Sequence, residues 1–85
     1  MMTNNFEQIP YLYSMEKKIF TKKLGKQIAK VRRAKGLTQV ELANLLKKSK
    51  QDVHRAESGS VTPTSYFIYR IAKGLKVNIN ELMDF

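Results

Sequence analysis

Signals that begin and end helices divide most of this chain into short segments, and that division limits the folds open to it. From Thr21 onward, residues with a side-chain oxygen stand at expected helix starts, and glycines stand at expected helix ends. Between these signals, apolar residues recur at steps of three and four, which places them on one side of a helix. No segment reads convincingly as a strand. The sequence therefore predicts an all-α domain of five short helices.

The first two predicted helices have clear boundaries. Residues 21–35 form the first, and Gly36 is well placed for the left-handed conformation that ends many helices. Gly25, inside this helix, is unfavourable by roughly 1 kcal/mol relative to alanine. Thr38 and Glu41 have the spacing of a capping box, in which each side chain accepts a hydrogen bond from the backbone N–H of the other. They predict that the second helix starts at Thr38.

The remaining three helices are predicted from the same kinds of signal. The third covers residues 49–58 and ends before Gly59. Thr62 and Pro63 predict the start of the fourth helix, and Asn78 predicts the start of the last one. The expected core consists of the apolar residues on the inner faces, namely Leu24, Ile28, Val31, Leu42, Ala43, Leu45, Leu46, Val53, Ala56, Ile68, Ile71, Ala72, Leu75 and Leu82.

Residues 1–20 lack this organisation. They contain Pro10 and many large apolar side chains, and no clean period orders their first half. We expect residues 1–20 to be an N-terminal arm or extension and residues 21–85 to form the folded domain. The large apolar residues of the arm are Phe6, Ile9, Tyr11, Leu12, Tyr13, Met15, Ile19 and Phe20.

The charge balance indicates the kind of partner. Sixteen Lys and Arg residues against seven Asp and Glu residues give a net charge of +9, which attracts polyanions. Nucleic acid is the first candidate and an anionic membrane surface the second. Composition does not distinguish DNA from RNA.

Several other classes are not expected. The chain has no cysteine and one histidine, so neither a thiolate zinc site nor a helical His-Glu-x-x-His site is available, and we expect no metal and no cofactor. No glycine-rich phosphate loop or catalytic constellation is present, so an enzyme is not expected. No apolar run is long enough for a membrane span, and the N-terminus does not resemble a secretory signal, which favours a cytoplasmic protein.

The second and third predicted helices have the features of a helix-turn-helix. Ala43 is small where the two helices must cross, and Val53 is a β-branched anchor on the second of them. Lys50, Gln51 and Arg55 then lie on its outer face near the N-terminus, the end that enters the major groove of DNA. The pattern predicts binding to duplex DNA.

The chain here resembles the lambda-repressor-like family of Cro and repressor proteins. The resemblance covers about residues 22–83, and its strength lies in the joint order and spacing of many residues. They are Leu24-Gly25 with Ile28 and Arg32; Leu37-Thr38-Gln39 with Leu42-Ala43; Val53; Glu57 with Gly59; Pro63; and Ile71-Ala72-Lys73 through Leu75 and Val77 to Glu81-Leu82. Lys47 departs from the pattern, because the family usually has a left-handed glycine there. A lysine in that conformation costs about 1–2 kcal/mol.

The resemblance implies a role for each matching residue. Base edges would be read by Ser49, Lys50, Gln51 and Arg55, and the DNA backbone would be contacted by Thr38, Gln39, Ser58 and Ser60. Arg32 and Glu57 match a family ion pair. Asp52 is expected to cap its helix rather than to accept from a cytosine. For His54, a phosphate contact and a solvated side chain are equally favoured, and most other cations of the first helix are expected to attract DNA at long range.

The resemblance implies a sequence-specific transcriptional regulator, in particular a repressor that binds DNA as a homodimer. Phage-type repressor, restriction-modification controller and DNA-binding antitoxin remain open within this class. The alternative is an antitoxin that mainly binds a protein toxin through residues 1–20. RNA binding is disfavoured, because a helix in a groove does not suit A-form RNA. The apolar C-terminal end, Leu82 to Phe85, is the favoured dimer surface, and the arm is the competing one.

Overall fold

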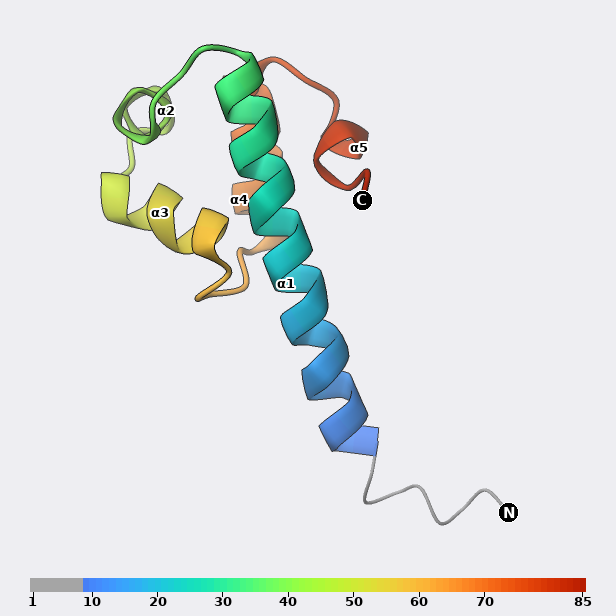
Figure 1. Cartoon of the computed structure of the whole chain (residues 1–85). Coiled ribbons are helices and arrows are strands. Elements are labelled where there is room, and N and C mark those ends of the chain that lie inside the picture. Colours follow the sequence, from blue (N-terminus) through green and yellow to red (C-terminus); the bar gives the residue numbers. More distant parts are fainter. Residues whose placement is uncertain (1–8) are drawn as a thin grey trace.

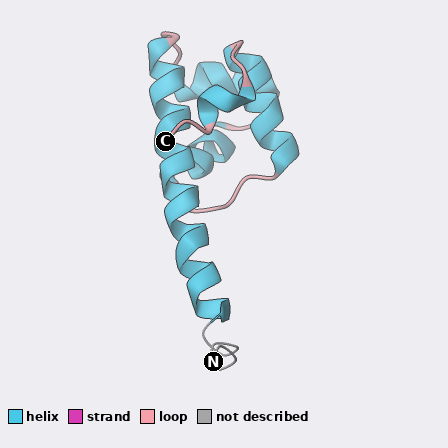
Figure 2. Cartoon of the chain, turned by 90° about the vertical axis from the view of Figure 1, so that its right-hand side faces the viewer, coloured by secondary structure: helices cyan, strands magenta, loops and turns pink. Residues whose placement is uncertain are grey.

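The computed structural model describes residues 9–85, which form five helices and no strand (Figures 1 and 2). The helices are α1 (Ile9–Ala34), α2 (Gln39–Leu46), α3 (Lys50–Ser58), α4 (Ser65–Leu75) and α5 (Ile79–Leu82). The predicted all-α fold with five helices is confirmed. None of these helices combines the length and the apolar character that crossing a bilayer requires.

The first helix is much longer than predicted. It begins at Ile9 and not at Thr21, and it continues without a break to Ala34. Pro10 is the second residue of the helix, where its missing N–H would have had no partner and its fixed φ suits the first turn. Figure 1 shows that this N-terminal half extends well beyond the other four helices, which gather around the C-terminal half. The proposed boundary after residue 20 falls inside α1, and the predicted Phe6 lies outside the described residues.

The core lies where the C-terminal half of α1 meets the other helices. Its members are Leu24, Ile28, Leu42, Ala43, Leu46, Val53, Ile68, Ile71, Ala72, Leu75 and Leu82, with Val31 packed against them. One predicted core residue is placed wrongly, because Leu45 is 56% exposed. Helix α2 has only about two turns, and its inner face is filled by Leu42, Ala43 and Leu46.

Gly25 explains how closely α1 and α3 approach each other. A Cβ atom at this position would lie 2.6 Å from the carbonyl oxygen of Ala56 and would also collide with that of Glu57. Both obstacles are backbone atoms, so they cannot move aside as a side chain could. The glycine that weakened the helix prediction is therefore what allows α3 to pack directly on α1.

One of the two turns with a definite prediction agrees with it and the other does not. Lys47 adopts the left-handed conformation predicted for the turn, with φ of 55°. The predicted start of the fourth helix at Thr62 is wrong, since the hydroxyl of Thr64 accepts the amide of Phe67 and α4 begins at Ser65. Thr62 instead hydrogen bonds to Thr21 across 3.1 Å, which fastens the loop between α3 and α4 to α1.

Candidate nucleic-acid interface

Helix α3 is capped at both ends by its own sequence. The Ser49 hydroxyl accepts the amide of Asp52 at 3.1 Å, and the Asp52 carboxylate accepts the amide of Ser49 at 3.2 Å. The Ser49 hydroxyl also donates to the Asp52 carboxylate, and this hydrogen bond, followed by the one from the Ser49 amide, lowers the pKa of Asp52. At the other end, Gly59 takes a left-handed conformation, and its amide donates to the carbonyl of Arg55. Asp52 thus has the predicted capping role, and α3 is a short helix with well-defined ends.

The outward side chains of α3 do not take part in the packing of the core. Val53 and Ala56 point into the core, which turns Lys50, Gln51 and Arg55 outward to solvent. The side chains of these three outward residues make no hydrogen bond within the described part of the chain. Their donors are therefore available to a ligand. Ser49 differs from them, because its hydroxyl already donates to Asp52 at 2.9 Å.

A buried charge network fixes the position of α3. Arg32 on α1 donates to the two carboxylate oxygens of Glu57 at 2.6 and 2.9 Å, so the expected ion pair is present. Arg32 also donates to the carbonyl of Leu37 at 2.7 Å, and Gln39 donates to Glu57 at 2.9 Å. Both charged side chains are less than a tenth exposed. The hydrogen bond that Arg32 donates to Glu57 raises the pKa of Arg32. One network thereby joins α1, α2 and α3.

The predicted backbone-contact residues come from the start of α2 and from the C-terminal end of α3 with the loop that follows it. Gln39 and Thr38 are at the start of α2, where the Thr38 hydroxyl accepts the amide of Glu41 in the predicted capping box. Ser58 and Ser60 lie at the far end of α3, with their hydroxyl oxygens 3.0 Å apart. Gln39 also reaches this end of α3, because it bonds to Glu57 and lines one hollow together with Ser58.

A hollow between α1 and α3 brings together cations that the sequence did not single out. It measures about 280 Å³, and its lining includes Lys26 and Arg33 of α1, Gln39 of α2, and His54 of α3. Lys22, one turn before Lys26, donates to the carbonyl of Ser58 at 3.4 Å. The spacing of Lys22, Lys26 and Arg33 places them on the side of α1 nearest α3, a signal hidden by cations elsewhere on the helix.

The chemistry of this surface is hydrogen bonding and charge attraction. A row of exposed donors on α3 suits the edges of bases in a groove, which offer acceptors such as the guanine O6 and N7 atoms. Lysine, arginine and hydroxyl groups at its borders suit phosphate oxygens. No neighbouring carboxylate opposes such a ligand strongly, because Glu57 is paired with Arg32 and Asp52 is held in its cap.

Comparison with known proteins gives a consistent result. The sequence model of the helix-turn-helix family matches residues 28–82, which include the ion pair and all of α2 and α3. Among curated proteins, no significant match was found.

Three solved structures are similar to this chain. The restriction-modification controller protein C.AhdI from Aeromonas hydrophila is 31% identical, with a TM-score of 0.70, and the alignment covers 73% of this chain and 94% of that one. An HTH_3 family transcriptional regulator from Vibrio cholerae is 25% identical, with a TM-score of 0.76 over 80% of this chain but only 38% of its own. The clp gene regulator ClgR from C. glutamicum is 22% identical, with a TM-score of 0.74 over 76% of this chain and 84% of its own, and supports the fold alone.

Proposed function

The chain belongs to the helix-turn-helix family of Cro and repressor type, and we propose that it represses transcription by reading a specific duplex DNA sequence with α3. DNA binding and transcription regulation are the activities of this family. The observation that carries the finer proposal is the exposed face of α3, where Lys50, Gln51 and Arg55 have no partner among the described residues. This face rests on a helix that buried contacts hold rigidly, so its donors keep a fixed spacing.

The contact residues divide into two groups. Lys50, Gln51 and Arg55 read base edges, and Ser49 adds a contact once its hydroxyl turns from Asp52. Thr38, Gln39, Ser58 and Ser60 contact the sugar-phosphate backbone, assisted by the cations of the hollow between α1 and α3. We assign His54 to this backbone group, because it lines that hollow together with Lys26 and Arg33.

Selection of bound sequences from a random duplex pool, followed by titrations with variants, tests this proposal. Arg55→Ala should cost about 1–3 kcal/mol on the selected site and relax preference at one base pair. Gln39→Ala should weaken binding about equally on every sequence. Lys73→Ala is the matched control, since it removes the same charge from α4. If Arg55→Ala and the control bound all duplexes equally well, α3 would not be the helix that reads the bases.

We further propose that two copies bind a two-fold-related operator, because one short helix reads too few base pairs and paired half-sites lie ~34 Å apart. Ile79, Met83 and Phe85 are between 37% and 49% exposed and supply an apolar surface. The ring of Phe85 lies 5.8 Å from that of Phe20 on α1. The two surfaces considered for dimerisation therefore adjoin each other at Phe20 and Phe85.

Sedimentation measures the contribution of each part of the dimer surface. Phe85→Asp should give monomers, while a chain lacking residues 1–14 should remain dimeric, because Phe20 is still present. A dimeric Phe85→Asp variant beside a monomeric truncated chain would move the interface to the arm.

The similarity to C.AhdI favours control of restriction-modification genes over the other regulatory roles. Toxin binding by residues 1–20 stays a prediction.

A further inference from the structure

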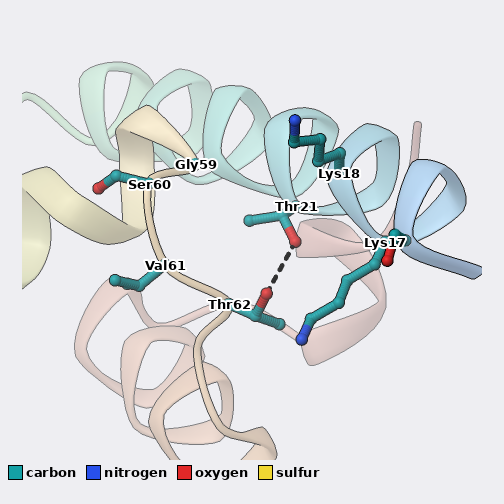
Figure 3. Close-up of a pocket in the computed structure, with 8 residues that line it drawn as sticks. Lys17, Lys18, Thr21, Gly59, Ser60, Val61 and Thr62 are labelled. Carbon is teal, nitrogen blue, oxygen red and sulfur yellow. Dashed lines mark hydrogen bonds between the residues drawn. The ribbon is translucent and has the colours of Figure 1, made fainter. Parts of the chain in front are cut away.

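A second basic surface lies where the N-terminal half of α1 passes the loop between α3 and α4. A hollow of about 420 Å³ separates the two segments there (Figure 3). Helix α1 contributes Ser14, Lys17, Lys18 and Thr21 to its lining, and residues 59–62 of the loop form the other wall. All of the α1 wall precedes residue 22, where the resemblance to Cro and repressor proteins begins, and so it also precedes the family match that starts at residue 28.

The two walls of this hollow are fixed to each other. Thr21 is only 4% exposed, and its hydroxyl oxygen lies 3.1 Å from that of Thr62, as the dashed line in Figure 3 marks. Gly59 lies so close to α1 that a Cβ atom there would be 3.1 Å from the Cα atom of Lys22. The lysines of α1 therefore keep a constant position relative to the loop that ends α3.

The lining has the chemistry of a phosphate site. Among the described residues its charged members are Lys17 and Lys18, and the hydroxyls of Ser14, Ser60 and Thr62 add hydrogen-bonding groups. Glu16 lines a neighbouring hollow together with Lys17, so it offsets part of the charge of Lys17, whereas Lys18 does not line that hollow. Lysine and hydroxyl groups are the usual partners of DNA phosphates, and they bind them whatever the base sequence.

We propose that this hollow binds a backbone phosphate of the duplex whose bases α3 reads, so that the contact track of Ser58 and Ser60 continues along α1. Ser60 belongs to both the predicted backbone contacts and the lining of this hollow, which makes the two surfaces continuous. The inference rests on the proposed DNA binding. It adds a contact from the part of α1 that projects beyond the helix-turn-helix core.

A pair of charge-matched double variants tests the proposal. Lys17→Gln/Lys18→Gln removes the cations of the hollow, and Lys23→Gln/Lys30→Gln removes two exposed cations of α1 that line none of the hollows described above. Titrations of the full chain on the selected duplex give the slope of log affinity against log salt. Losing one phosphate contact per copy should reduce the steepness by about 0.9, and the affinity roughly tenfold at 0.1 M salt, for each copy bound. The control should keep the slope of the parent chain.

Ethylation interference locates the contact independently of affinity. In the parent chain, ethylation of a phosphate beside the loop contacts should reduce binding, and in the Lys17/Lys18 variant it should have no further effect. Equal slopes for both double variants, with parent DNA binding intact, would overturn this inference and leave the proposed function standing. A parent chain that binds no duplex would overturn the proposed function itself. Thermal melting of both variants confirms that neither is unfolded.

Discussion

The two halves of α1 are continuous helix, yet they are helical for different reasons. From Thr21 to Ala34 the helix packs against α3, α4 and α5, and Leu24 and Ile28 are fully buried. From Ser14 to Phe20 every residue is exposed, and no buried stripe faces the rest of the protein. Packing stabilises the first stretch, whereas the second depends on intrinsic propensity and on continuing a helix already formed. The packed stretch therefore determines the stability of the fold, whereas the side chains of the exposed stretch are not needed for packing.

The largest difference between the halves should appear on removing charges. Arg32→Met and Glu57→Met each leave a buried charge without its partner and should destabilise the fold by roughly 3–5 kcal/mol. Glu16→Met, on the projecting half, should change stability by about 0.5 kcal/mol or less. Urea denaturation of the variants measures these free energies.

The double variant Arg32→Met/Glu57→Met should lose less than the sum of the two single changes, because no charge is then stranded. Strictly additive losses would show that the two residues do not stabilise each other. They would also remove the main reason for treating the packed half as the rigid one.

Proline substitution should give the next largest contrast. Lys30→Pro removes a backbone hydrogen bond within the packed half and should destabilise the protein by about 3 kcal/mol or more. Glu16→Pro is matched to it as an exposed helical position, but it should cost the global fold little, because only the turns before it are lost. Circular dichroism measures the lost helix, and thermal melting measures the stability. A Glu16→Pro protein as unstable as Lys30→Pro would mean that the projecting half supports the core.

Much of the packed part could be predicted because its signals are local. Capping boxes, the left-handed Gly36 and the periodic apolar residues each need only a few neighbouring positions to be recognised. The start of α1 could not be predicted this way, since an exposed helix has no buried stripe to reveal it. The hollow holding Lys26, Arg33 and His54 depends on how α1 and α3 cross, which no local pattern encodes. The Arg32–Glu57 pair came from the family resemblance and not from spacing.

Replacing glycines of the packed part by alanine should change the free energy of unfolding less, and the two replacements should differ in sign. Gly25→Ala places a Cβ against backbone carbonyls and should destabilise by about 1–3 kcal/mol, despite the better helix propensity of alanine. Gly74→Ala would place a Cβ atom 2.9 Å from the Cδ2 atom of Leu46 and 3.5 Å from the Cδ1 atom of Leu42, and both are ends of side chains rather than backbone atoms. We therefore expect Gly74→Ala to be close to neutral or slightly stabilising. Denaturant titration compares them, and a harmless Gly25→Ala would contradict the close approach of α1 and α3.

The smallest expected effect is a gain in stability at the turn before α3. Lys47 has φ of 55°, and glycine adopts this conformation without the penalty of a side chain. Lys47→Gly should raise stability by about 1 kcal/mol, measured as a higher melting temperature. Lys48→Gly, at the next position, is the control and should bring no such gain. An unchanged or lower melting temperature for Lys47→Gly would indicate that the turn holds lysine without strain.

The free outer face of α3 also bears on how such a protein diversifies. The side chains of Lys50, Gln51 and Arg55 make no hydrogen bond among the described residues, so we expect substitutions at these positions to leave the folding free energy almost unchanged. If α3 reads DNA as proposed, natural selection can alter the preferred DNA sequence one residue at a time without first finding compensating mutations in the core. For the same reason, α3 is a suitable helix for engineering new DNA specificities, provided that the Arg32–Glu57 network, which positions it, is left unchanged.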